Sequence, residues 1–228
     1  MNYWRVLCIG FGLVLFMACS SENQWLEAAL NLAGDNRAEL QRVLDRYKEE
    51  DGDKYHAACY LIENMPFHGA YEGKALENYR RYFSEYVSFP HSRHVQELID
   101  SLKRADGEFS INQLTYKRDI VAVDSTFLVN HIEWAFKVWH EQPWGKYVGF
   151  ETFCECILPY RIGDEPLSLW RKEIYERYNP MLDEFRKTGK ADDPKAAAQL
   201  LMDTLRRANY RHTALFPSGP HLGPDVLK

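Results

Sequence analysis

The sequence predicts an all-α protein, an irregular multi-helix bundle followed by a C-terminal extension rich in proline and glycine. Three observations support this fold class. Nearly every segment after residue 22 repeats its apolar residues at the spacing of an amphipathic helix. No convincing strand alternation occurs before the last thirty residues. Proline and glycine become frequent after Tyr210, which is typical of a connection rather than a helix.

The composition sets limits on size and partners. The 228-residue chain is 46% hydrophobic and carries a formal net charge of −5. This is enough to bury a core in one domain, or in two small ones at most. The aromatic content of 14% favours well-packed helices, with a carbohydrate- or peptide-facing surface as the alternative. The acidic balance offers no basic field, so we expect no nucleic-acid partner.

Residues 1–18 are predicted to be a lipoprotein signal peptide. Arg5 precedes an apolar run over residues 6–18, which is shorter than the ~20 apolar residues of a spanning helix. Phe16-Met17-Ala18-Cys19 resembles a lipobox, and this implies cleavage before Cys19 and a diacylglyceryl anchor on its thiol. An ordinary cleaved signal peptide is the alternative, although no small residue stands three positions before the cut.

Four segments are therefore predicted along the chain. After the signal peptide, residues 19–24 are expected to be a short tether, and residues 25–210 a helical domain. Residues 211–228 are expected to connect to a further, missing domain. The anchor implies a cell-envelope location, attached to the outer membrane on its periplasmic face or at the cell surface.

Three helices are predicted at the start of the helical domain. The first covers residues 22–33 and ends at Gly34, which suits a left-handed capping position. Asp35 and Asn36 are able to cap the second, and Pro66 stops the third. The faces expected to be buried on the second and third helices are Leu40, Val43, Leu44 and Tyr47, and Ala58, Leu61, Ile62 and Met65.

Two more helices are predicted in the middle of the chain. Residues 66–73 are rich in turn formers and are expected to be a loop. Short joints favour antiparallel neighbours for the helices that follow. Residues 108–124 are ambiguous, because Ile120, Val121 and Val123 fit either a short strand or the lead-in to a helix. The apolar stripes of the two helices are Leu76, Tyr79, Phe83, Tyr86 and Val87, and Val95, Leu98, Ile99 and Leu102.

The rest of the domain is organised around residues 142–171. A helix beginning at Asp124 or Ser125 leads into this stretch. Inside it, a helix is expected to end at Pro159, with Phe150, Phe153, Cys154, Ile157 and Leu158 on one face. The next stripe is Leu167, Trp170, Ile174 and Tyr178, and we expect it to break at Asn179-Pro180. Asp193-Pro194 is a capped helix start.

Cys154 is the candidate nucleophile, with His131 or His140 as its base. A catalytic thiol needs a lowered pKa and some exposure, whereas Cys154 lies on an apolar stripe. Core packing is therefore the favoured interpretation, and it applies to Cys59 as well. Three cysteines remain after the signal peptide and Cys19, which does not suit a disulfide framework.

No metal ion or cofactor is expected from the sequence. Glu151 and Glu155 lie four residues apart on a helix, where two carboxylates can share a metal, but solvated surface explains them better. His91 and His94 have ligand spacing only if they are helical, and no third ligand accompanies them. The chain also lacks a phosphate-cradling glycine loop, GxSxG and HExxH.

A specific surface is the better candidate for a site. Arg161 follows the proline that stops a helix, and it can pair with Glu165 or Asp164 across the next turn. A structural ion pair that holds this corner is the alternative. The residues of the candidate binding rim are Trp144, Tyr160, Arg161, Glu165, Trp170 and Arg171.

Three blocks of the sequence resemble the N-terminal helical region of transglutaminase-like lipoproteins, which are common in Bacteroidota. They are LIENMPFH (61–68), EWAFKVWHEQPWGKYVGFETFCECILPYR (133–161) and EPLSLWR (165–171). In that family the helical region precedes a papain-like core, whose cysteine attacks an amide carbonyl with the help of a histidine and an aspartate. No residue of this chain matches that catalytic set, so no catalytic residue is implied here.

The resemblance implies a lipid-anchored helical domain, non-catalytic as it stands, that scaffolds or gates a Cys-His-Asp core acting on peptide or cell-wall amides. Its expected partners are the membrane, its own downstream core and a peptide or peptidoglycan-like ligand. The full-length relative is expected to be an acyl transferase or a cysteine peptidase. One alternative is a free-standing envelope lipoprotein that binds a peptide or glycan on the rim, and another is a small hydrolase that uses Cys154.

Overall fold

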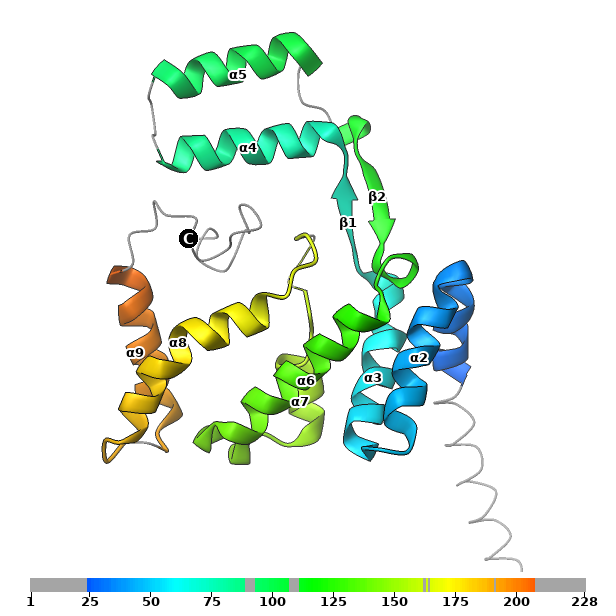
Figure 1. Cartoon of the computed structure of the whole chain (residues 1–228), viewed down its shortest axis with the longest axis vertical. Helices are drawn as coiled ribbons and strands as arrows, with labels where there is room; N and C mark the ends of the chain where they lie inside the picture. The colour runs from blue at the N-terminus through cyan, green and yellow to red at the C-terminus, as the bar shows by residue number, and fades with distance from the viewer. Residues whose placement is uncertain are drawn as a thin grey trace, which may run out of the picture. The chain divides into compact units, whose positions relative to one another are not determined.

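The computed structural model describes residues 24–88, 93–106, 111–161, 163, 165–190 and 192–207. Helices make up most of these residues, and the sheet found among them is a single pair of short strands (Figure 1). This confirms the predicted all-α fold class. The described residues divide into two compact units, one within the ranges 24–68 and 118–128 and the other within 69–117 and 129–207.

The first unit is built on three successive helices. Residues 24–32 form the first, and Gly34 ends it with a φ of 56°, the left-handed conformation that favours glycine. The helices α2 (Arg37–Lys48) and α3 (Gly52–Asn64) follow. They pack on each other through the predicted stripes, whose members are all buried: Leu40, Val43, Leu44, Tyr47, Ala58, Leu61, Ile62 and Met65.

The cap of α2 differs from the prediction. Asn36 occupies the N-cap position with helical dihedral angles and makes no side-chain capping bond. Its amide instead donates to the main-chain carbonyls of Ile120 (3.1 Å) and Val123 (2.9 Å). The Asn36 side chain therefore donates to carbonyls distant in sequence, and its oxygen does not accept from the first turn of α2 as a cap would. By contrast, Asp51 does cap α3, because its carboxylate accepts from the Lys54 N–H.

The Asn36 contacts join α2 to a second segment of the same unit. This segment contains the short 3₁₀ helix η4 (Asp119–Val121), so Ile120 and Val121, which the sequence left ambiguous, form a 3₁₀ turn. The Glu39 carboxylate accepts from both the hydroxyl (2.7 Å) and the N–H (2.9 Å) of Ser125, which lowers the Glu39 pKa to about 2. Ile120 and Val123 are fully buried here.

The expected loop at residues 66–73 is wrong in part. After the 3₁₀ helix η2 (Met65–Phe67), the chain forms β1 (Gly69–Glu72), which pairs with β2 (Thr115–Arg118). Each strand is only four residues long, and every side chain of β2 is exposed, so neither carries an apolar alternation to recognise. Gly69 permits the pairing, because a Cβ there would lie 2.6 Å from the Lys117 carbonyl oxygen.

The two helices predicted in the middle of the chain are present. They are α4 (Lys74–Ser88) and α5 (Arg93–Asp106), and they pack against each other as a helical hairpin (Figure 1). The short 3₁₀ helix η3 (Ile111–Gln113) precedes β2. On α5, Val95 is buried and the other predicted stripe residues are half-buried.

The helix α6 (Ser125–Glu141) leads into the central stretch, as predicted. Its predicted stripe is buried at Leu128, Ile132, Ala135 and Phe136 and half-buried at Trp139. The 3₁₀ helix η5 (Pro143–Tyr147) and then α7 (Phe150–Cys156) follow. The helix α7 is shorter than expected, because its last predicted turn, Ile157 and Leu158, lies in the bend that precedes Pro159.

The predicted break at Asn179-Pro180 is wrong, because α8 (Trp170–Arg186) continues through Pro180. A proline inside a helix removes one N–H and leaves the carbonyl four residues earlier without its helical partner. Both Pro180 and Glu176 are exposed, so water is able to serve that carbonyl. The last helix, α9 (Pro194–Arg207), begins as predicted: the Asp193 carboxylate accepts from the N–H groups of Lys195 and Ala196.

The predicted signal peptide, Cys19, most of the tether and the C-terminal connection lie outside the described residues. In the part of the chain that the structure describes, no helix combines the length and apolarity needed to cross a membrane.

Candidate functional site

The bend that follows α7 is where the central stretch concentrates its polar contacts. The helix closes with the N–H groups of Ile157 and Leu158, which both donate to the Phe153 carbonyl (3.0 and 2.8 Å). The last carbonyls of a helix have no partner within it. Pro159 prevents the helix from continuing, so the carbonyls of residues 157–160 need donors from elsewhere.

Three side chains supply those donors. The Arg171 Nη2 donates to the carbonyls of Ile157 (2.6 Å) and Pro159 (3.3 Å). The His131 Nε2 donates to the Leu158 carbonyl, 2.6 Å away. The indole Nε1 of Trp170 donates to the Tyr160 carbonyl at 3.0 Å. Four consecutive carbonyls are thus bonded by side chains from α6 and α8, an arrangement that we call the carbonyl corner.

The hydrogen bonds assign the tautomer of His131. A carbonyl oxygen only accepts, so the proton lies on Nε2. The Arg171 Nη2 is 3.4 Å from the same nitrogen, but its two protons already point to two carbonyls, so this is a contact between donors. Burial, and then the positive charge of Arg171, lower the His131 pKa to about 3. The imidazole is therefore neutral at physiological pH and is already engaged as a hydrogen-bond donor.

Arg171 is a buried cation without a carboxylate partner among the described residues. Its guanidinium lies over the Trp170 ring at 4.5 Å and bonds main-chain oxygens, while its Nε has no hydrogen-bond partner there. Burial lowers the Arg171 pKa to about 10, which leaves the side chain charged at neutral pH. Helix-terminal carbonyls carry partial negative charge, and at this corner they take the place of an acidic residue.

The structure places half of the candidate rim inside the molecule. Tyr160, Arg161 and Arg171 are only 4%, 6% and 9% exposed, whereas Trp144, Glu165 and Trp170 are half-buried. Tyr160 and Trp170 both make edge-on contacts with the His131 ring, with distances between ring centroids of 5.9 and 6.2 Å. Residues expected to face a ligand therefore hold the corner together instead. Asp164, one of the two proposed partners of Arg161, lies outside the described residues.

Cys154 is buried, as expected for a packing residue. It is 4% exposed on α7, next to Phe153, which is fully buried and stacks on Trp139 at 4.3 Å. Cys156 is exposed, Cys59 is half-buried, and none of these three cysteines forms a disulfide. Of the two candidate bases, His131 is engaged at the corner, and His140 is an exposed residue beside the Trp139 ring.

These positions predict different thiol reactivities. In the folded protein, we expect Cys156 to react quickly with a maleimide at neutral pH and Cys154 to react only after denaturation, because burial blocks the reagent. Mass spectrometry of the labelled peptides measures both. The Cys156→Ser variant should lose the fast reaction and Cys154→Ser should keep it. Fast labelling of Cys154 would restore the hydrolase alternative.

The acidic and histidine pairs assemble no metal site in the described residues. Glu151 and Glu155 are both exposed on α7, in agreement with the solvated surface inferred from their spacing. No group of three or more His, Cys, Asp or Glu side chains lies close enough to hold a metal ion within the described ranges. His91 is outside those ranges, so the His91–His94 pair is not described.

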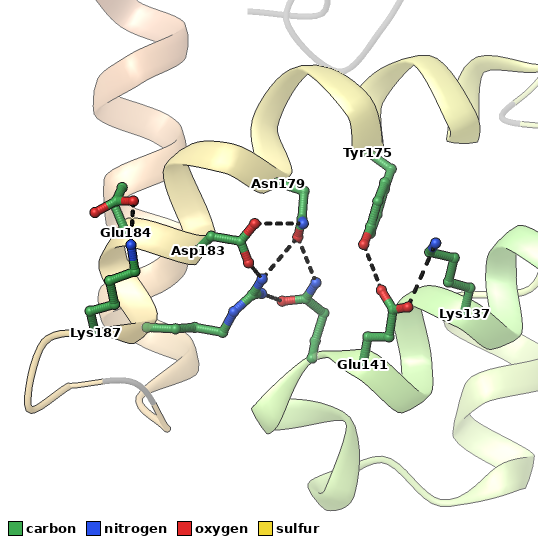
Figure 2. A network of polar contacts seen from close by, with 9 residues as sticks. Lys137, Glu141, Tyr175, Asn179, Asp183, Glu184 and Lys187 are labelled. Carbon is green, nitrogen blue, oxygen red and sulfur yellow. Dashed lines mark hydrogen bonds and ion pairs between the residues drawn. The ribbon is translucent and has the colours of Figure 1, made fainter.

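The sequence did not reveal how α6 is tied to α8. Near the end of α6, Glu141 accepts from the Tyr175 hydroxyl at 2.5 Å, which raises the Tyr175 pKa to about 12 (Figure 2). Gln142, the residue after α6, donates from its side-chain amide to Asn179 (3.2 Å) and accepts from the Arg186 guanidinium (2.5 Å). Both partners lie further along α8. Only the polar character of these side chains was visible in the sequence, and that character does not identify partners.

Trp139 is the other residue whose role was not predicted. Its indole Nε1 donates to the carbonyls of Gly145 (3.2 Å) and Val148 (3.1 Å), which folds η5 back onto the end of α6. The centroid of its ring also lies 5.7 Å from that of Phe136 and 6.2 Å from that of Phe150. Phe136, Trp139, Phe150 and Phe153 thus form one packed aromatic cluster.

Taken together, the fold and the corner define an all-α protein with a buried polar cluster and a two-stranded ribbon. No family model, no curated protein and no solved structure matches the chain.

Proposed function

We propose that this chain is the lipid-anchored helical region of a transglutaminase-like protein of the cell envelope. In this role it does no chemistry itself and scaffolds or gates a Cys-His-Asp core that acts on peptide or cell-wall amides. The family assignment rests on the three sequence blocks. The non-catalytic role is supported by the carbonyl corner, where the Nε2 of the candidate base His131 donates a hydrogen bond to a main-chain carbonyl.

The corner suits a scaffold for a physical reason. A bend whose carbonyls are all bonded by buried or half-buried side chains resists local opening, since a broken bond at a buried position would leave a polar group unsatisfied. Two of the three resembling blocks meet at this bend: residues 133–161 supply the accepting carbonyls, and residues 165–171 supply the donors Trp170 and Arg171. His131 lies two residues before the first of these blocks.

The rim-binding alternative is less well supported. A surface that holds a peptide or glycan needs accessible aromatic and charged groups. Tyr160, Arg161 and Arg171 are buried, and only the half-buried Trp144, Glu165 and Trp170 remain to contact a ligand.

The nucleotide sequence of the gene tests whether the proposed catalytic core exists. The nucleotide sequence after the Lys228 codon should continue in frame with a Gly-x-Cys motif, followed by a histidine and an aspartate. The complete product should incorporate an amine into a glutamine peptide or hydrolyse an amide, and residues 19–228 alone should do neither. A stop codon directly after Lys228, with no such activity from the product, would contradict the proposal.

The proposed anchor is tested by metabolic labelling with an alkyne fatty acid. Cells that express the full chain should yield a labelled protein in the membrane fraction, because acylation would occur on the Cys19 thiol. The Cys19→Ser variant should lose the label entirely. Cys156→Ser, which removes an exposed thiol far along the chain, should keep it. Equal labelling of the wild type and Cys19→Ser would exclude the anchor at this residue.

A further inference from the structure

The helix over residues 24–32 has an exposed apolar strip in addition to its buried face. Its buried face consists of Leu26, Ala29, Leu30 and Ala33. Trp25, which is 71% exposed, and Leu32, which is 48% exposed, lie on the other side together with the exposed Ala28. At 100° per residue these three residues fall at the i, i+3 and i+7 positions of one strip. We call them the Trp25 strip.

The charged groups of this helix lie on a separate strip. Arg37 donates to the Glu27 carboxylate and to the Asn31 side chain, both at 2.8 Å, so the charge of Glu27 is compensated on its own side. The Trp25 strip itself contains no charged residue. A single exposed hydrophobic residue needs no explanation, but an uncharged strip led by a tryptophan has the chemistry of an interface.

The chain itself limits what the strip can meet. Cys19 precedes Trp25 by six residues, and six residues span at most roughly 20 Å even when fully extended. An acyl chain on Cys19 therefore keeps Trp25 within that distance of the lipid. Tryptophan favours the headgroup level of a bilayer, where its ring is apolar and its N–H stays hydrated.

We propose that the Trp25 strip lies on the membrane surface beside the anchor, with Trp25 and Leu32 at the boundary between headgroups and acyl chains. This inference rests on the proposed acylation of Cys19. The occupant is the lipid itself and not an anionic headgroup, because the chain carries a net charge of −5 and the strip has no basic residue. The contact would complement the acyl chains with a second, protein-borne attachment.

The experiment uses the protein purified from membranes and reconstituted into phosphatidylethanolamine vesicles with brominated acyl chains, which quench a tryptophan inserted among them. The wild type should lose emission relative to unbrominated vesicles, and Trp25→Phe should lose much less. Trp144→Phe is the matched control and should be quenched like the wild type. Leu32→Glu keeps the Trp25 fluorophore but puts a charge in the strip, so its quenching should fall. Phe67→Glu, at a residue 81% exposed outside the strip, should leave quenching unchanged.

Acylation and quenching are scored separately. An acylated protein whose quenching depends on Trp25 and Leu32 supports the inference. An acylated protein with equal quenching in the wild type and Trp25→Phe overturns the strip and leaves the anchor intact. If Cys19 is not acylated, Trp25-dependent quenching still supports the strip while the anchor fails, and its absence overturns both.

Discussion

Replacing Gly145 by alanine is expected to destabilise the protein by more than about 3 kcal/mol. A Cβ at this position would lie 1.8 Å from the carbonyl oxygen of Trp139 and 2.9 Å from its carbonyl carbon. Both are backbone atoms of α6, so rotating a side chain cannot relieve the clash. The 3₁₀ helix η5 would have to shift, which would break the bonds from the Trp139 indole to Gly145 and Val148.

Urea unfolding followed by circular dichroism measures this effect. Gly149→Ala is the matched control, because a Cβ there has nothing within 4 Å and the residue is exposed with a φ of −70°. Its stability should stay within about 1 kcal/mol of the wild type. Equal stability of Gly145→Ala and Gly149→Ala would contradict the close packing of η5 on α6.

The second large effect is a loss of stability in acid that depends on His131. The imidazole is neutral in the folded protein, with a pKa of about 3, whereas its ordinary value is 6.5. Between these two pH values the unfolded chain binds the proton and the folded chain does not. Stability therefore rises with pH in this window. On acidification it should fall by about 1.4 kcal/mol for each pH unit below 6.5, in addition to the effect of the carboxylates.

His131→Gln isolates this contribution, because glutamine offers an N–H to the Leu158 carbonyl and does not titrate. The variant should be less stable than the wild type at pH 7, since its amide fits the corner less well. Its stability should nevertheless decline less steeply between pH 6.5 and 4. His140→Gln, at an exposed histidine, should retain the wild-type slope. If His131→Gln and the wild type show the same slope, the imidazole is not neutral in the folded protein.

These two predictions concern two different contacts of the central stretch with α6. Gly145 controls how η5 returns to α6, and His131 controls how the bend after α7 is held. Both contacts are made by α6, which makes this helix the support of the central stretch. If the chain does serve a papain-like core, changes at either position should reduce its activity through loss of folded protein and not through loss of chemistry.

Helices and their buried faces were predictable because both depend on local spacing. The stripe of α2 and that of α3 were identified residue by residue, since an apolar residue at every third or fourth position has few ways to be buried except on one helix face. The burial of Cys154 followed from the same spacing. The pairing of β1 with β2 was missed for the complementary reason: strands of four residues, one of them exposed throughout, are too short to show a period.

The sequence singled out the stretch that contains the carbonyl corner but did not predict how its residues interact. The stretch 142–171 is the right region, and Tyr160, Trp170 and Arg171 do lie close together at one corner. Sequence reasoning assigned them to a surface, because arginine and tyrosine are usually exposed or half-exposed. Burial of Arg171 is tolerated here only because helix-end carbonyls from a bend more than ten residues away accept its protons.

The sequence alone determined that the protein is helical, where α6 and α9 begin and which residues α2, α3 and α6 bury, because those properties follow from the identity of near neighbours. It did not identify the core of α8, whose buried residues are Arg171 and Leu182 and not the predicted stripe. The tertiary structure decided where the polar side chains go. His131 donates to a carbonyl 27 residues away. The Asn36 side chain donates to carbonyls 84 and 87 residues away and does not cap its own helix. Pro180 likewise remains inside a helix whose surroundings leave the affected carbonyl in water. Hydrogen-bond partners separated by such distances leave no periodic trace in the chain, so only the folded arrangement could identify them.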